Sequence, residues 1–211
     1  MKTNDLISLL VEDAPVRARL GRALILALVA GVVVSGSILL STIGIRHNMA
    51  SVFETVRVLF KIAFTLVLAI TACGVVFRIG RPGAELKASV VALFIPLAML
   101  VTAVTSELAV VPPGAWETSL VGNNARFCLV FIPVLSLAPL AGFLLALKVG
   151  APARPSLAGA TAGFAAGALA AAIYAWHCPD DSPLFVATWY MIAIAAVTAI
   201  GGLIGRRYLR W

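Results

Sequence analysis

The sequence predicts an all-α membrane protein, a bundle of six transmembrane helices with both chain ends in the cytoplasm. Of the 211 residues, 62% are hydrophobic and only 12% are charged, whereas soluble domains carry about 45–50% apolar and about 25% charged residues. The apolar residues gather in six stretches, each close to the roughly 20 residues that a helix needs to cross a bilayer. The basic residues collect in alternate loops, and this bias sets the predicted orientation.

The predicted spans cover residues 23–45, 58–77, 88–106, 127–147, 155–176 and 184–205. Lys61 falls in the first turn of the second span, where we expect its long side chain to reach the lipid headgroups. The first span is longer than the apolar region of a signal peptide, so we expect a retained anchor. The chain then consists of a cytoplasmic N-terminal segment, 1–22, and a six-helix transmembrane domain with short loops, 23–211.

The distribution of Lys and Arg predicts which side each loop faces. With the N-terminus inside, twelve of the sixteen basic residues are cytoplasmic, and only Arg46, Arg57, Lys61 and Arg126 lie on the other side. Since cytoplasmic loops carry the excess of Lys and Arg, the sequence predicts a multi-pass membrane protein with both termini in the cytoplasm. The same bias explains the net charge of +7. No basic patch is interleaved with aromatic residues, so we expect no direct binding to nucleic acid.

Small residues recur at four-residue spacing in the last two predicted spans. The fifth span carries Gly159, Gly163 and Gly167, and the sixth carries Gly201 and Gly205. In lipid, such stripes let two helices approach closely. We expect these glycines to pack helices within one bundle, and the alternative is a homodimer interface.

The sequence offers little support for catalysis or ion-coupled transport. The spans carry no charged residue at mid-membrane depth, where ion-coupled transporters bind and release their ion. The zinc-protease motif HExxH, the GxSxG elbow, the P-loop and the dinucleotide fingerprint are all missing from fitting contexts. We therefore expect a protein that is not an enzyme and has no resident cofactor.

Two cysteines are the clearest candidates for chemistry. Cys128 begins the fourth span and Cys178 follows the fifth, so the predicted topology places both at the outer face. In the oxidising periplasm, two such thiols can form a disulfide. Together with His177 and Asp180 they would also suit a soft divalent metal. A disulfide, a thiol-based sensor of metal or oxidant, and two unrelated buried cysteines all remain open. Cys73 is expected to be a small buried hydrophobe.

The N-terminal segment predicts a short amphipathic helix. The run 5–14 ends at Pro15, and a residue able to cap a helix precedes it. Three leucines share one face and three acidic residues surround them. The helix either lies on the membrane or docks to a protein partner. The residues concerned are Asp5, Leu6, Leu9, Leu10, Glu12 and Asp13.

Six segments carry a resemblance that extends over nearly the whole chain. They are MKTNDLISLLVEDA, FRIGRPGAEL, the stretch 128–139, GAPARPSLAGATAGFAAGALAA, WHCPDDSPLFVATWY and the terminal GRRYLRW. The cluster WHCPDDSPLF…WY and the final LRW are the most specific. In these segments the chain resembles the NrsF family, which are six-span anti-sigma factors of the bacterial inner membrane.

The resemblance implies a concrete function. Such a protein holds an extracytoplasmic-function sigma factor at the membrane, keeps it from RNA polymerase, and releases it under oxidative or heavy-metal stress. The family's paired cysteines match Cys128 and Cys178, which favours a sensor that holds a heavy-metal ion transiently or reacts with an oxidant. Its N-terminal segment matches 1–22, which favours docking. The alternatives are a thiol-disulfide membrane oxidoreductase and a small channel or transporter.

Overall fold

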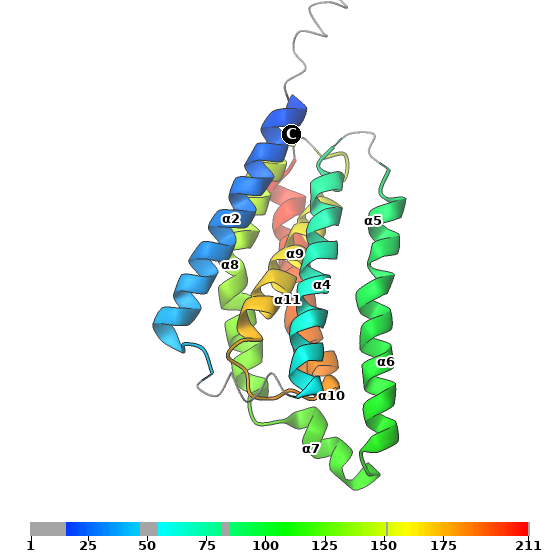
Figure 1. Ribbon diagram of the computed structural model, residues 1–211. Coiled ribbons are helices and arrows are strands. Elements are labelled where there is room, and N and C mark those ends of the chain that lie inside the picture. Colours follow the sequence, from blue (N-terminus) through cyan, green and yellow to red (C-terminus); the bar gives the residue numbers. More distant parts are fainter. Residues whose placement is uncertain (1–15, 47–54, 82–84, 151, 211) are drawn as a thin grey trace, which may run out of the picture.

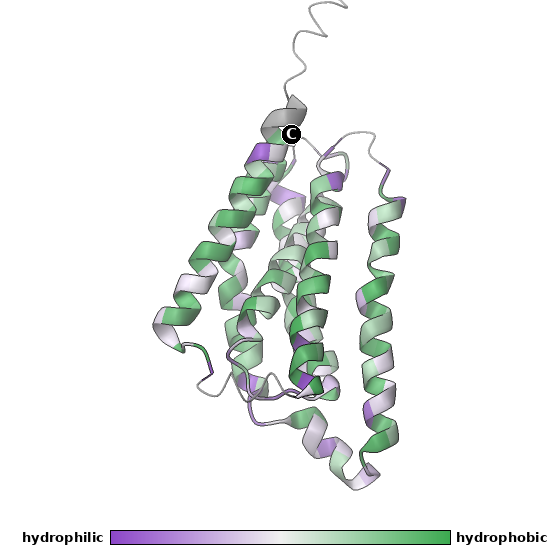
Figure 2. Cartoon of the chain, in the orientation of Figure 1, coloured by the Kyte–Doolittle hydropathy of each residue, from purple (hydrophilic) through white to green (hydrophobic). Residues whose placement is uncertain are grey.

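The computed structural model describes residues 16–46, 55–81, 85–150 and 152–210, and in these ranges it contains helices and no strand. Six helical segments of the described chain are long and apolar enough to cross a membrane. The predicted all-α fold with six candidate spans is therefore confirmed. Apolar residues follow the helices along their length, and most hydrophilic residues lie toward their ends (Figure 2).

The elements follow one another as an up-and-down bundle (Figure 1). Four spans are single helices: α2 (Val16–Thr42), α4 (Val56–Ile79), α8 (Ala125–Gly150) and α9 (Pro155–Tyr174). The third span consists of α5 (Lys87–Ala92) and α6 (Phe94–Val110). The sixth consists of α10 (Pro183–Phe185), the π-helical η2 (Val186–Tyr190) and α11 (Met191–Tyr208). Between α6 and α8 lie the short helices η1 (Pro113–Ala115) and α7 (Trp116–Val121). The start of α2 and the end of α11 lie at the same end of the bundle (Figure 1). We call the opposite end, formed by residues 43–46, 111–124 and 175–182, the far end.

Two features differ most from those predicted. The first helix begins at Val16 rather than at residue 23, so it runs through residues 16–22 as well. The third span is broken at Leu93, between α5 and α6. Pro96 explains this break, because its ring lacks an N–H and collides with the carbonyl of the residue four positions before it.

The helix α9 lies at the centre of the bundle, with 61% of its spanning window buried, against 11% for the third span. Its small residues allow this position, since Ala and Gly let neighbouring backbones approach. The glycines of α9 face α11: a Cβ added to Gly163 would lie 2.5 Å from the carbonyl oxygen of Val197, and one added to Gly205 would lie 2.6 Å from the Cα of Gly159. The predicted glycine stripes thus meet each other within the chain.

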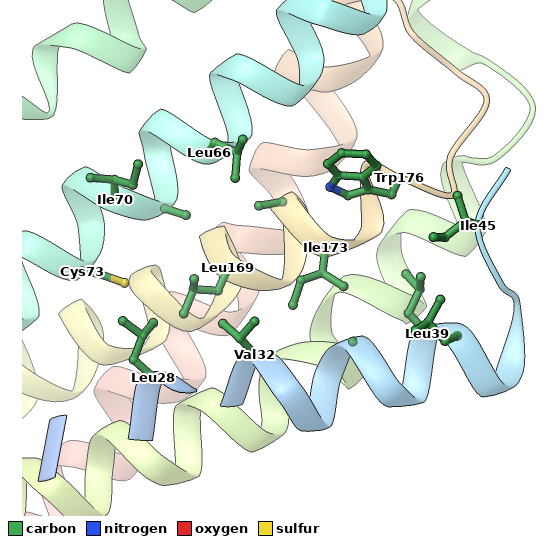
Figure 3. A pocket seen from close by; sticks show the side chains of 14 residues that line it. Leu28, Val32, Leu39, Ile45, Leu66, Ile70, Cys73, Leu169, Ile173 and Trp176 are labelled. Atoms are coloured by element: carbon green, nitrogen blue, oxygen red, sulfur yellow. The ribbon is translucent and has the colours of Figure 1, made fainter. Parts of the chain in front are cut away.

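An apolar pocket of about 490 Å³ lies between α2, α4 and α9. Figure 3 shows Leu28 and Val32 of α2, Ile70 of α4 and Leu169 of α9 around it, and Cys73 also lines it. Cys73 is buried, as expected, and it belongs to this pocket rather than to the far end.

Candidate functional site

The two cysteines singled out by the sequence lie against each other at the far end. Cys128 is in the first turn of α8, and Cys178 lies in the loop that follows α9. Their Sγ atoms are 4.0 Å apart, a distance that fits a hydrogen bond between two free thiols. Both side chains are fully buried. The bundle therefore holds two free thiols in contact, one at each open end of the hairpin formed by α8 and α9.

Two phenol groups accompany the thiols. Tyr174 ends α9, Tyr190 ends η2, and their ring centroids are 6.1 Å apart. Both side chains are fully buried, and neither hydroxyl oxygen has a hydrogen-bond partner among the described residues. Buried polar groups are nearly always paired. The hydroxyl groups of Tyr174 and Tyr190 are therefore free to bond a further group beside the cysteines.

Lys61 does not reach the headgroups, and the prediction that it would is wrong. Its side chain is fully buried. The Nζ atom donates to the carbonyl oxygen of Cys178 at 2.6 Å, to that of Asp180 at 3.3 Å, and to the carboxylate of Asp181. All three donors of the ammonium group are thus used on one loop, which offsets the cost of burying a charge.

The two aspartates of this loop are held by different neighbours. Asp181 also pairs with Arg46, with 2.8 Å between Nη1 and Oδ2. Asp180 Oδ2 accepts the backbone N–H groups of Asn123 at 3.1 Å and Asn124 at 2.8 Å, and the Asn124 side chain at 3.0 Å. The loop carrying Cys178 is therefore tied to the segment after α2, to α4 and to the start of α8.

A second buried charge, Glu107 at the end of α6, closes the same end of the bundle. Its Oε2 accepts hydrogen bonds from the Ser182 hydroxyl at 2.9 Å and from the Leu184 N–H at 3.2 Å. Its Oε1 lies 3.2 Å from Nη2 of Arg57 on α4. The predicted third span ends at residue 106, so the sequence left Glu107 in the loop that follows and did not indicate this role, because nothing local in the sequence identifies its partners.

The four predicted metal ligands are not assembled into one site. His177 directs Nδ1 at the Gly44 carbonyl oxygen, 3.0 Å away, and the Asp180 carboxylate is occupied by amide groups. Within the part of the chain that the structure describes, no group of three or more His, Cys, Asp or Glu side chains could hold a metal ion. Cys128 and Cys178 alone remain together as soft ligands.

The surroundings make the two thiols unequal. The pKa of the Cys178 thiol is lowered from its ordinary value, chiefly because Cys128 donates a hydrogen bond to its sulfur. Burial opposes this effect, while the positive charge of Lys61 and the Asp180 backbone act in the same direction. Since the thiolate is the reactive form of cysteine, Cys178 is the thiol better prepared to attack an electrophile.

Comparison with known proteins decides the family. The sequence profile of the NrsF family, described as "negative regulator of sigma F", matches residues 10–211. The chain belongs to this family. It is 32% identical over 213 residues to the "Probable anti-sigma-F factor NrsF" of Azospira oryzae, and 32% identical over 214 residues to the "Anti-sigma-F factor NrsF" of Caulobacter vibrioides, with each chain covered completely. No solved structure matches the chain.

Membership of the NrsF family confirms the resemblance found in the sequence and places the chain among regulators rather than among enzyme families. The residues predicted to bind a partner, Asp5, Leu6, Leu9, Leu10, Glu12 and Asp13, lie outside the described residues. The far end contains what sequence reasoning could not see: the Lys61 and Glu107 contacts and the buried phenols. The signal for Lys61 was its position, since a lysine inside an apolar span costs free energy unless it is paired.

Proposed function

We propose that this NrsF-family protein is an anti-sigma factor that holds a sigma factor of the extracytoplasmic-function class at the bacterial inner membrane. The observation that carries the proposal is the full-length match to two proteins named as anti-sigma-F factors. The six apolar helices support the membrane location. A sigma factor kept at the membrane is kept from RNA polymerase, so retention alone is enough for negative regulation.

The orientation follows from charge. Of the fifteen Lys and Arg residues in the described part of the chain, eleven fall at the end where α2 begins and α11 ends, and four fall at the far end. This bias marks a cytoplasmic face. We infer that both termini are cytoplasmic and that the far end, with the thiols, faces the periplasm. The partner and the thiol pair are then on opposite sides of the membrane.

The N-terminal segment is the proposed docking site. Leu6, Leu9 and Leu10 form an apolar face that a groove on a protein partner would bury, and Asp5, Glu12 and Asp13 would meet basic residues around that groove. Burying three leucines contributes about 4.5–9 kcal/mol before ordering costs. Ordering a free peptide removes much of this gain, which keeps the complex releasable.

Release is proposed to start at the thiol pair. An oxidant would join Cys128 and Cys178 in a disulfide, or a soft heavy-metal ion would bridge them. Their contact at 4.0 Å supports both reactions, because little movement is needed to bring the sulfurs together. The cross-membrane effect requires two arrangements of the bundle whose balance the thiol chemistry shifts.

The test is recovery of sigma factors from membranes with the intact chain and with a variant lacking residues 1–15, which leaves α2 complete. We expect the intact chain to retain a sigma factor of the extracytoplasmic-function class and the truncated chain to lose it. A matched variant, Leu6→Ser with Leu9→Ser, should lose it too, whereas Asp5→Asn should weaken it less. Equal retention would move the contact to the loops at 80–86 and 148–154. If no form retained a sigma factor, the proposed function would fail.

A second experiment tests the sensor. Stress induction of the sigma factor's genes should be lost when Cys128→Ser and Cys178→Ser are combined. It should persist in Cys73→Ser, which alters the thiol in the apolar pocket between α2, α4 and α9. Induction that survived the double substitution would exclude the thiol pair as the sensor.

A further inference from the structure

Lys61 brings an ammonium group from α4 to the loop that carries Cys178. Its Nζ binds the carbonyl oxygens of Cys178 and Asp180 and the carboxylate of Asp181. The first of these bonds, at 2.6 Å, is made to the cysteine's own backbone. The amine therefore fixes the position of Cys178 relative to α4 as well as bringing a positive charge to it.

The two carboxylates nearest this ammonium also have other partners. Asp181 is shared between Lys61 and Arg46, so one carboxylate serves two cations. The Asp180 carboxylate accepts three amide donors of residues 123 and 124. Lys61 itself is fully buried and bonded to the backbone of Cys178, in a setting where charges interact strongly.

The other groups facing Cys178 favour an anionic sulfur as well. Cys128 approaches from α8, Tyr174 from α9 and Tyr190 from η2, while His177 on the same loop is turned to the Gly44 carbonyl. The two tyrosine hydroxyls have no acceptor in the part of the chain that is described. A thiolate at Cys178, or an oxygen added to it, would supply the acceptor that these donors lack.

We propose that Lys61 is a positioning residue that makes Cys178 the first thiol to react and leaves Cys128 to resolve the product. This inference rests on the proposed role of the thiol pair and assigns an order of events within it. Cys128 lies in the first turn of α8, and no described hydrogen bond or ion pair brings a cation to it, whereas Cys178 receives the Lys61 amine on its own carbonyl oxygen.

The order can be written with a small neutral reagent, methyl methanethiosulfonate. The Cys178 thiolate attacks the sulfenyl sulfur, a bond forms between the two sulfurs, and methanesulfinate leaves with the electron pair. The Cys128 thiol then attacks Sγ of Cys178, its proton passes to the departing methanethiolate, and a Cys128–Cys178 disulfide and methanethiol result. Atoms and electrons balance without any further reactant.

The experiment measures the rate of the first step against pH for the full chain in lipid nanodiscs, by mass spectrometry of each cysteine. Cys128→Ser reports Cys178 alone, and Cys178→Ser reports Cys128 alone. We expect Cys178 to react about tenfold faster than Cys128 at pH 7. Lys61→Met, combined with Cys128→Ser, should slow Cys178 about tenfold and move the midpoint of its pH profile up by about one unit, since one unit is a factor of ten in thiolate.

Three further variants separate positioning from a merely structural role. Lys61→Arg keeps the charge and should retain most of the rate. Asp181→Asn removes the anion that offsets Lys61, so the midpoint should move down, a direction that loss of structure does not produce. Arg57→Met, one turn earlier on α4 and paired with Glu107, is the matched control and should leave the profile unchanged.

Equal rates for the two cysteines, or a Cys178 profile unchanged by Lys61→Met, would overturn the inference. Should Lys61→Met fail to fold, the Asp181→Asn profile decides: a midpoint that does not fall contradicts the proposal. These readings involve no sigma factor. Loss of stress induction in cells therefore tests the proposed function separately, and either can fail without the other.

Discussion

Glu107 shows how a single buried carboxylate joins three elements at the far end. It lies in the last turn of α6, accepts hydrogen bonds from Ser182 and from the N–H of Leu184, and pairs with Arg57 on α4. The carboxylate also satisfies an N–H at the start of the sixth span, where the first N–H groups of a helix have no partner within it. We therefore regard Glu107 as the residue that anchors the third span to the bundle.

Replacing this carboxylate gives the first prediction. Glu107→Ala removes the acceptor of the Ser182 hydroxyl and one of the two acceptors of the Leu184 N–H, which is left with Ser182 Oγ. An unsatisfied buried group costs about 1–3 kcal/mol, whereas the half-exposed Arg57 can turn to water. We expect a clearly lower melting temperature for the purified protein in detergent. The exposed Glu117 provides the control: Glu117→Ala should melt like the wild type. Equal melting of both variants would show that the Glu107 contacts contribute nothing to stability.

At the level of residues, the sequence was enough to place side chains at the ends of predicted spans, but not to find contacts that depend on how the helices pack. Cys128 and Cys178 could be placed at one face because each lies at the end of a predicted span. Lys61 was assigned to lipid headgroups because its partners, the carbonyls of Cys178 and Asp180, lie 117 and 119 positions away. Backbone carbonyls carry no signature in a sequence, so such a site appears only when the helices are packed.

Among the elements, α9 owes its central place to its smallest residues. Its candidate span has the lowest mean hydropathy of the six found in the described chain, yet the largest buried share. Hydropathy measures how well a helix dissolves in lipid, whereas burial in a bundle depends on how closely backbones approach. The sequence could therefore identify the six spans, but hydropathy alone could not rank them from centre to periphery.

The contact between α9 and α11 gives the second prediction. A Cβ on Gly163 would already lie 2.5 Å from the Val197 carbonyl oxygen and 2.9 Å from the Cα of Thr198, so Gly163→Leu must push the two helices apart. Overpacking of this kind costs about 1–3 kcal/mol or more. The matched control is Gly36→Leu on α2, where an added Cβ meets nothing within 4 Å.

We expect Gly163→Leu to melt well below the wild type and Gly36→Leu to melt at or slightly above it, because removing a helical glycine favours the helix by about 1 kcal/mol. Unfolding in detergent, followed by circular dichroism, measures both. Similar losses for the two variants would indicate that any leucine at a glycine position is harmful, and would remove the special role assigned to the α9–α11 contact.

For the whole molecule, the proposed orientation is the third prediction. Gly114 lies exposed in the segment between α6 and α8, and Arg210 lies exposed after α11. The bundle places them at opposite ends (Figure 1). With the positive-inside orientation, a membrane-impermeant maleimide should label Gly114→Cys in intact spheroplasts and Arg210→Cys only after lysis. Labelling with the sides exchanged would reverse the topology and move the thiol pair to the cytoplasm.

The bundle must also carry a signal between its two ends. Helix α4 is the most direct connection, since it holds Lys61 beside Cys178 and ends at Ile79 next to the loop on the other side. Its 24 residues span about 36 Å at 1.5 Å per residue. A displacement of the Cys178 loop would move α4 as well, because all the described acceptors of the Lys61 amine lie on that loop.

Linkage turns this coupling into the last prediction. If the disulfide weakens sigma-factor binding by a given factor, bound sigma factor must disfavour the disulfide by the same factor. Coupling free energies of about 1–3 kcal/mol correspond to about 20–65 mV for a two-electron couple. We therefore expect the reduction potential of the Cys128–Cys178 pair, measured in nanodiscs against glutathione buffers, to become more positive by this amount when saturating sigma factor is added.

A variant lacking residues 1–15 should show no shift, since it has lost the proposed docking segment. If sigma factor leaves the reduction potential of the intact chain unchanged, the thiols and the docking site are not coupled through the bundle.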